Sequence, residues 1–292
     1  MIVFDVICAG QAVLDCITRN RENAPFKPNV YRAESIRLRP GGDAVNEACA
    51  LASLGVRAAI ACGLGDDPAG RVILEHLKAA GVETERVCAM AGETPIANLQ
   101  VAGDGSRISV NSGATRLEGF GIDPAAVKGA KIVSLASLFR PPLADYDQIR
   151  RLVLSAKADG TVVCADTKLP LYGPRSLDDI ADVLPRIDYI FPNEKEAEYY
   201  SGRTALPDMA RAIADKGARN VIIKAGAAGC YVYAEGRGYA LPAVPIDRVV
   251  DTTGAGDNFV AGFIGGLLRG RPVLDCAEAG LKQAALAIGR RS

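Results

Sequence analysis

The sequence has no excess of charge of either sign, because Lys and Arg number 34 and so do Asp and Glu. A protein that wraps nucleic acid needs a basic surface, and one held to membranes by charge needs a polybasic segment. We therefore expect neither partner. No apolar run approaches the ~18–20 uncharged residues of a membrane span, and residues 1–5 lack the basic start of a signal peptide. These absences predict a cytoplasmic globular protein.

Histidine and paired cysteines are also scarce. The single histidine, His76, excludes a poly-His metal site, and a Ser-His-Asp triad would have to use it. The eight cysteines lie in apolar stretches and none forms a C-x-x-C pair. This favours buried free thiols in a reducing compartment over disulfides or zinc ligands. Acid–base chemistry must therefore fall on carboxylates.

Short β-branched runs alternate with helical patterns along the whole chain, which predicts an α/β fold with a doubly wound, mostly parallel sheet. Ligands then bind beyond the carboxyl ends of the strands. We predict strands near 3–9, 58–62, 131–135, 161–165, 189–191, 220–224 and 230–233. We predict helices near 44–54, 68–80, 144–158, 207–216, 257–268 and 274–288.

Two stretches, 12–40 and 94–116, do not follow the alternation. They contain strand-like runs at 31–38, 97–101 and 107–111, with a hairpin signal at 103–105, where glycines flank an aspartate. We interpret both stretches as strands of a small β-sheet lid, inserted into a single domain that spans residues 1–292.

The strongest chemical signal is the sequence DTTGAGDNF at 251–259, which leads directly into an apolar helix. Gly254, Ala255 and Gly256 leave backbone amides uncovered at a helix N-terminus, where anions bind. We expect the positive helix end to hold Asp257 ionised. Amides that bind an anion beside a carboxylate suit phosphoryl transfer. The simpler interpretation is a Gly-rich turn with Asp257 as an ordinary cap.

The chain as a whole resembles the ribokinase-like (PfkB) carbohydrate kinases. Residues 251–262 match their second signature, D-T-x-G-A-G-D-x-F-x-x-G, at every fixed position. Four more segments resemble family motifs in the same order along the chain: RPGGDAVNEA at 39–48, GLGDDPAG at 63–70, PNEKEAE at 192–198 and IKAGAAG at 223–229. The resemblance implies a ribokinase-like fold with a small lid, and an ATP-dependent kinase.

The resemblance also implies roles for particular residues. Asp257 is then the base that deprotonates the substrate hydroxyl, with Gly254, Ala255 and Gly256 as the anion hole. Asn193 and Glu196 are expected to organise Mg²⁺, for which carboxylate and amide oxygens are suitable ligands. The residues expected along the ATP are Lys224, Gly226, Gly229 and Thr252.

On the sugar side, the resemblance implies contacts from five residues: Asp15, Gly42, Asp43, Asn46 and Lys168. Many members carry an arginine in the motif D-P-N-x-R after a central strand, and Lys168 is expected to replace it here. A lysine ammonium cannot reproduce the paired donors of an arginine guanidinium. Val13 stands where ribokinases keep a polar sugar contact, so the resemblance does not single out ribose. Members that accept sugar phosphates usually carry lysine at the position of Asp43, so we expect an unphosphorylated substrate.

We therefore predict an ATP-dependent kinase acting on the primary hydroxyl of a small unphosphorylated sugar, with fructokinases and ribokinases as the nearest comparison. A nucleoside kinase and a 2-keto-3-deoxygluconate kinase of the same fold remain open alternatives. A homodimer through the lid is expected, since lid sheets in this family often pair edge to edge. The chain ends at Ser292, before the loop that helps such members bind a monovalent cation. The loop is shortened or the chain is truncated, so the resemblance does not carry K⁺ activation over.

Overall fold

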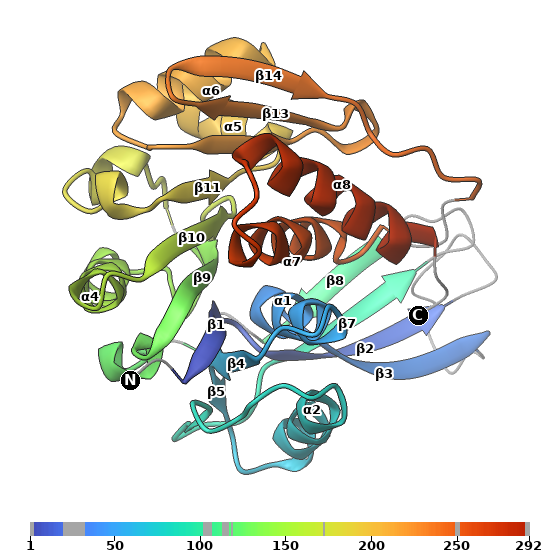
Figure 1. Ribbon diagram of the computed structural model, residues 1–292. Helices are drawn as coiled ribbons and strands as arrows, with labels where there is room; N and C mark the ends of the chain where they lie inside the picture. The colour runs from blue at the N-terminus through green and yellow to red at the C-terminus, as the bar shows by residue number, and fades with distance from the viewer. Residues whose placement is uncertain are drawn as a thin grey trace.

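The computed structural model describes residues 3–19, 33–101, 107–112, 117, 119–171, 173–248 and 252–289. Its main sheet has eight strands (Figure 1). Their order is β14 (Arg237–Leu241), β13 (Cys230–Ala234), β12 (Val221–Lys224), β11 (Tyr189–Phe191), β10 (Val162–Thr167), β9 (Ala130–Leu138), β1 (Phe4–Gly10) and β4 (Ala58–Ala61). Neighbours from β12 to β4 are parallel, whereas β13 runs antiparallel to both of its neighbours.

Helices cover both faces of this sheet and enclose two apolar cores. One face carries α1 (Asp43–Ser53), α2 (Pro68–Ala79), α7 (Ala255–Leu268) and α8 (Val273–Gly289). The other carries α4 (Tyr146–Ala158), α5 (Glu194–Ser201), α6 (Leu206–Asp215) and the 3-10 turns η1 (Pro124–Val127), η2 (Leu177–Ile180) and η3 (Leu184–Arg186). This is the doubly wound arrangement that the alternation predicted.

The strand sequences explain why both faces are buried. Successive side chains of a strand point to opposite sides of the sheet. Along β1, Val6 and Cys8 enter one core while Ile7 and Ala9 enter the other. A strand that serves two cores must be apolar at nearly every position, which is why these runs are continuous rather than alternating.

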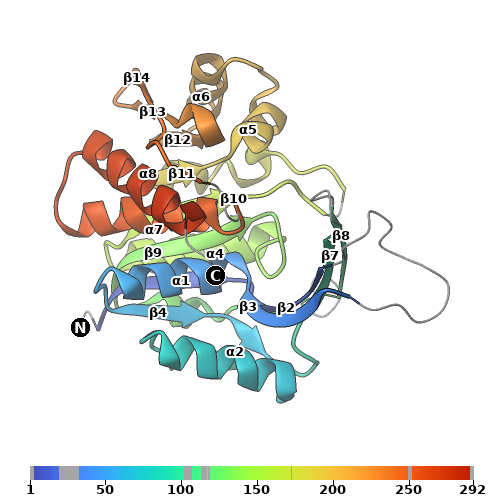
Figure 2. The ribbon, with the colours of Figure 1, turned by 90° about the vertical axis from the view of Figure 1, so that its right-hand side faces the viewer.

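A second, four-stranded sheet lies beside the main body (Figure 2). Its order is β3 (Ser35–Gly41), β2 (Val13–Arg19), β7 (Ile96–Val101) and β8 (Arg107–Asn111). β2 pairs antiparallel with β3 and parallel with β7, and β7 pairs antiparallel with β8. The two stretches that broke the alternation supply all four strands, although β2 corresponds to none of the three strand-like runs that were singled out. The hairpin signal at 103–105 and part of the run at 31–38 lie outside the described residues.

All seven predicted main-sheet strands and all six predicted helices are present, with ends shifted by a few residues. The edge strand β14 was missed because its side chains are mostly exposed, so it lacks an apolar run. Its turn uses Glu235 and Gly236 at positive φ, which suits a two-residue hairpin. The short parallel pair β5 (Gly63–Leu64) and β6 (Cys88–Ala89) was also missed. Within the described ranges, no helix is both long and apolar enough to span a bilayer.

Candidate active site

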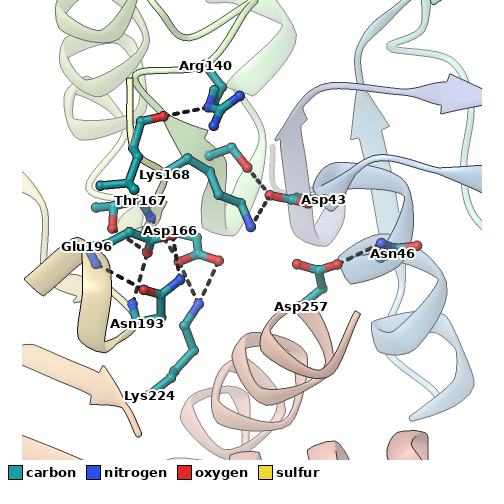
Figure 3. Close-up of polar contacts among 12 residues, drawn as sticks. Asp43, Asn46, Arg140, Asp166, Thr167, Lys168, Asn193, Glu196, Lys224 and Asp257 are labelled. Atoms are coloured by element: carbon teal, nitrogen blue, oxygen red, sulfur yellow. Dashed lines mark hydrogen bonds and ion pairs between the residues drawn. The ribbon is translucent and has the colours of Figure 1, made fainter. Parts of the chain in front are cut away.

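Polar side chains from several elements meet at the carboxyl ends of the central strands (Figure 3). In a doubly wound sheet, loops and helix N-termini converge at this edge and form the ligand site. The side chains that meet are Asp43, Asn46, Asp166, Thr167, Lys168, Asn193, Glu196, Lys224 and Asp257. The sequence analysis singled out all of them except Asp166 and Thr167.

The N-terminus of α7 carries the Gly-rich turn. Gly254 is the residue before the helix and has φ 73°, which glycine adopts without strain, and no side chain caps this helix end. The first amides of a helix have no acceptor within the helix. Ala255 N–H donates only a long bond of 3.3 Å, to the carbonyl of the exposed Thr252. Helix N-termini with amides of this kind can bind anions, which is the role predicted for residues 254–256.

Asp257 lies one residue further into α7 and is only 4% exposed. The amide of Asn46 donates to its Oδ2 at 2.7 Å. The expectation that the helix end holds Asp257 ionised is wrong. Burial first, and then the charges of Asp43 and Asp166, raise its pKa to about 7, although Lys168 and Asn46 act in the opposite direction. Desolvation and like charge outweigh the helix dipole here.

Asp43 does not cap α1, since the residue before this helix is Gly42 and no side chain caps it. Its carboxylate instead accepts a hydrogen bond from Ser137 and lies 3.1 Å from the Lys168 ammonium. Burial alone would raise the pKa of Asp43, but Lys168 and Ser137 outweigh burial and lower it. Gly42 is required for this connection because a Cβ there would lie 2.4 Å from the carbonyl oxygen of Gln11.

Asp166 and Lys224 form a second ion pair. Lys224 Nζ lies 2.7 Å from each carboxylate oxygen of Asp166, whose side chain is 1% exposed. Carboxylate oxygens of Asp43, Asp166 and Asp257 lie within 4.8 Å of one another. Two of these three carboxylates thus have their own lysine, and Asp257 has an amide partner instead. Asp257 is the member whose pKa is raised into the range of a general base.

The predicted magnesium residues form a reciprocal cap on α5. Asn193 Oδ1 accepts from the Glu196 amide at 3.0 Å, and Glu196 Oε2 accepts from the Asn193 amide at 2.9 Å. Asn193 Nδ2 also donates to Glu196 Oε1, and Thr167 Oγ1 to Oε2. These bonds engage both oxygens of a carboxylate that is only 3% exposed. The donor set fits Mg²⁺ held through its water shell rather than by a chelating carboxylate.

The two glycines predicted along the ATP differ in their surroundings. A Cβ at Gly226 would meet nothing within 4 Å, which leaves this loop open for a ligand. A Cβ at Gly229 would lie 2.0 Å from the carbonyl oxygen of Leu241, and its φ is 93°. Packing against β14 therefore explains Gly229, independently of any nucleotide. Gly226 begins the 3-10 turn η4 (Gly226–Ala228), and Gly229 directly follows it.

Asp15 extends from β2, where it is paired in register with Arg39 of β3. Its Oδ2 would lie 2.6 Å from a Cβ at Gly41, so glycine makes room for this carboxylate. Burial first, and then the charge of Asp43, raise the pKa of Asp15 to about 6, against the opposing effect of Arg39. Val13 is buried, so the structure offers no polar contact at that position.

Sequence reasoning missed several polar residues at this edge: Glu47, Ser137, Arg140, Asp166 and Thr167. Asp166 and Thr167 directly follow the apolar run 161–165, so a carboxylate at the end of a buried strand was the available signal. Ser137 has φ 74°, a left-handed conformation that is uncommon outside glycine, and no sequence pattern indicated it. Glu47 lies fully buried in α1, and its Oε1 has no partner among the described residues.

The sheet order, the helices on both faces and the adjoining small sheet define a ribokinase-like α/β fold. Arabidopsis thaliana ribokinase, solved in complex with ribose and ATP, superimposes with a TM-score of 0.85. This match covers 99% of this chain and 94% of that one at 23% identity, so it establishes the fold alone.

The chain belongs to the pfkB family of carbohydrate kinases, since the family model "pfkB family carbohydrate kinase" matches residues 3–292. An ATP-dependent ribose-1-phosphate kinase from Halopiger xanaduensis is 32% identical over 263 residues, which covers 89% of this chain and 83% of the relative. A cytidine kinase from Thermococcus kodakarensis is 39% identical over 109 residues, only 37% of this chain and 39% of that protein. The enzyme is therefore an ATP-dependent carbohydrate kinase.

Proposed function

We propose that this enzyme transfers the γ-phosphoryl group of ATP to the primary hydroxyl of a small, unphosphorylated sugar. The observation that carries the proposal is the placement of Asp257. It is a buried carboxylate on the first turn of α7, beside the open amides of the Gly-rich turn. A base and an anion site in contact are what phosphoryl transfer to an alcohol requires.

The reaction breaks the bond between the γ-phosphorus and the oxygen that bridges it to the β-phosphate, and it forms a new bond from phosphorus to the sugar oxygen. The hydroxyl proton passes to Asp257 and ADP leaves. In this proposal the amides of Ala255 and Gly256 stabilise charge on the transferring group. Mg²⁺, when bound near Asn193 and Glu196, neutralises phosphate charge.

The substrate side supports a neutral sugar. Asp15, Asp43 and Asp257 supply carboxylates that accept hydrogen bonds from hydroxyl groups, and such charge-assisted bonds are strong. Lys168, the cation beside Asp43, is already paired with that carboxylate. A substrate phosphate brings roughly −1.5 to −2 charges near neutral pH and would be repelled by this set.

A screen of ADP release across pentoses, hexoses, ketoses, sugar acids and nucleosides tests the proposal. Ribose 1-phosphate and fructose 6-phosphate belong in the same panel, because a related kinase is named for ribose 1-phosphate. We expect a neutral sugar to give the highest kcat/KM. Faster turnover of a sugar phosphate than of every neutral compound would overturn the neutral-sugar proposal, and a nucleoside would favour the alternative that the cytidine kinase match suggests.

The raised pKa of Asp257 predicts the pH dependence. A general base must be deprotonated to act, so kcat/KM should rise with pH through about 7 and then level off. Lys168 lowers this pKa, so Lys168→Met should move the rise to higher pH. Rate measurements from pH 5 to 9 with a substrate that does not itself titrate check both statements. A flat wild-type profile would contradict the assignment of Asp257.

Glu196→Gln should raise the Mg²⁺ concentration needed for half-maximal rate and lower turnover more than it weakens sugar binding. The substitution removes charge next to the metal site and replaces one acceptor of the α5 cap by a donor. Glu198→Gln, on the exposed side of the same helix, is the matched control. Titrating Mg²⁺ against rate is the measurement, and identical curves for Glu196→Gln and wild type would contradict the metal role.

We also propose that a second copy of the chain covers one face of the small sheet. Paired residues of neighbouring strands point to the same side, and the register places five large apolar side chains on one face. They are Ile36, Leu38, Ile96, Ile108 and Val110, each 40–66% exposed. The opposite face carries Asp15 and Arg39. This exposed apolar face, on which Asn98 and Gln100 of β7 also lie, supports face-to-face association more than the edge pairing that the resemblance implies.

Leu38→Lys combined with Val110→Lys should therefore convert a dimer into a monomer, because each ammonium would be buried without a partner. Arg37→Ser, on the opposite face of the same strand, should leave the mass unchanged. Sedimentation equilibrium at micromolar concentration gives the mass of each form. A wild-type protein that sediments as a monomer would rule out this interface.

A further inference from the structure

Three consecutive residues at the end of β10 each bind a different part of the active site (Figure 3). Asp166 binds Lys224, Thr167 Oγ1 donates to Glu196 Oε2 at 3.1 Å, and Lys168 lies 3.1 Å from Asp43. The same strand end therefore contacts the substrate side, the cap on α5 and the lysine of β12. Of these contacts, the one between Asp166 and Lys224 lies nearest to the Gly-rich turn.

The pair crosses the sheet. β11 lies between β10 and β12, so Lys224 reaches past the end of β11 to meet Asp166. Both carboxylate oxygens lie 2.7 Å from Nζ, and the Lys224 side chain is only 12% exposed. The Lys224 amide donates to the Pro192 carbonyl at 2.9 Å, which fixes its backbone next to the Asn193 cap. Lys224 is thus held at both ends.

The ammonium that Asp166 holds lies next to the first turn of α7. A Cβ at Gly256 would be 3.3 Å from Lys224 Nζ. An ammonium has three N–H donors and Asp166 accepts two, which leaves one for an oxygen of a bound group. The helix amides and the fixed ammonium lie next to each other, and together they can bind a multiply charged anion.

We propose that Lys224 contacts the transferring γ-phosphoryl group and that Asp166 is the positioning residue that aims its ammonium there. This inference rests on the proposed function and deepens it. The charge of the transferring group is spread over three equatorial oxygens, and the amides alone supply no formal positive charge. Lys224 supplies that charge from beside the first turn of α7, and Asp166 keeps the ammonium from turning into solvent.

A purely structural ion pair is the competing explanation. Breaking a buried pair destabilises a fold whether or not the pair takes part in a reaction. The Lys157–Asp188 pair is a suitable control, because it is also partly buried but joins α4 to the residue before β11. Lys157→Met should lower stability and leave kcat unchanged.

Two measurements separate the explanations. In turnover, Lys224→Met should lower kcat at least 100-fold and Asp166→Asn about 10–100-fold, each with sugar KM within threefold of wild type. The double variant should be no slower than Lys224→Met alone, because Asp166 acts through the lysine. Additive losses, or a Lys157→Met control whose kcat falls as far as that of Lys224→Met, would overturn the inference while leaving the proposed function intact.

The second measurement needs no knowledge of the sugar. By calorimetry, Lys224→Met should weaken ATP binding about tenfold and leave ADP binding unchanged, since only ATP has the γ-phosphoryl group. Equal changes for ATP and ADP would overturn the inference. Failure of every sugar in the screen, together with a loss confined to ATP, would count against the proposed acceptor and in favour of the role of Lys224.

Discussion

Asp257→Asn lowers turnover by about 10²–10⁴-fold in our account, while ATP and sugar still bind within a few-fold of wild type. General-base contributions are typically of this size. The asparagine keeps the shape of the side chain but has no pair of electrons basic enough to take the hydroxyl proton. Steady-state rates, together with calorimetric binding of each substrate, give both quantities.

The matched control is Asp275→Asn, because Asp275 is also in the first turn of a helix but is exposed. It should leave turnover unchanged. A variant at Asp257 that keeps more than a tenth of wild-type turnover would show that another group takes the proton. The Asn46 contact to Asp257 would then need a different explanation.

Gly42→Ala is the second substitution with a large expected effect. Gly42 has φ 95° and ψ 141°, a region that is essentially restricted to glycine, and a Cβ would lie 2.4 Å from a backbone oxygen. We expect the free energy of unfolding to fall by about 3 kcal/mol or more, since backbone strain and overpacking each cost roughly 1–3 kcal/mol.

Gly55→Ala, at the other end of α1, is the control. Gly55 also has positive φ, 76°, but a Cβ there would meet nothing within 4 Å. This variant should lose only about 1–2 kcal/mol. Urea unfolding measures both, and equal losses would contradict the contact at Gly42. Active Gly42→Ala enzyme should also bind sugar poorly, because the displaced turn carries Asp43 and Asn46.

The sequence predicted the main sheet well because each central strand must be apolar on both faces. The motifs shared with the pfkB kinases, rather than composition or periodicity, indicated which residues gather at the site, and these motifs fall directly after strands or at helix N-termini. Asp257, Asn46 and Glu196 are examples. Chain topology brings such positions to one edge whatever the details of packing.

Electrostatics could not be predicted in the same way. The raised pKa of Asp257 depends on its burial and on Asp43 and Asp166, which are distant in sequence. The expectation from the helix N-terminus gave the wrong direction for the pKa of Asp257, because it considered only the residues nearest in the sequence. The pairing of Asp43 with Lys168, and of Asp166 with Lys224, likewise depends on the register of strands across the whole sheet.

The central claim is tested most directly by identifying the phosphorylated product. The enzyme is incubated with ATP, Mg²⁺ and the best acceptor from the screen, and ADP and the phosphate ester are quantified by ³¹P and ¹H NMR. We predict one ADP for each ester formed, with phosphorus coupled to the protons of a primary carbon, and at least about 100-fold less ester in the same time with Asp257→Asn. Phosphate on a secondary hydroxyl, or ADP released only with inorganic phosphate, would contradict the account.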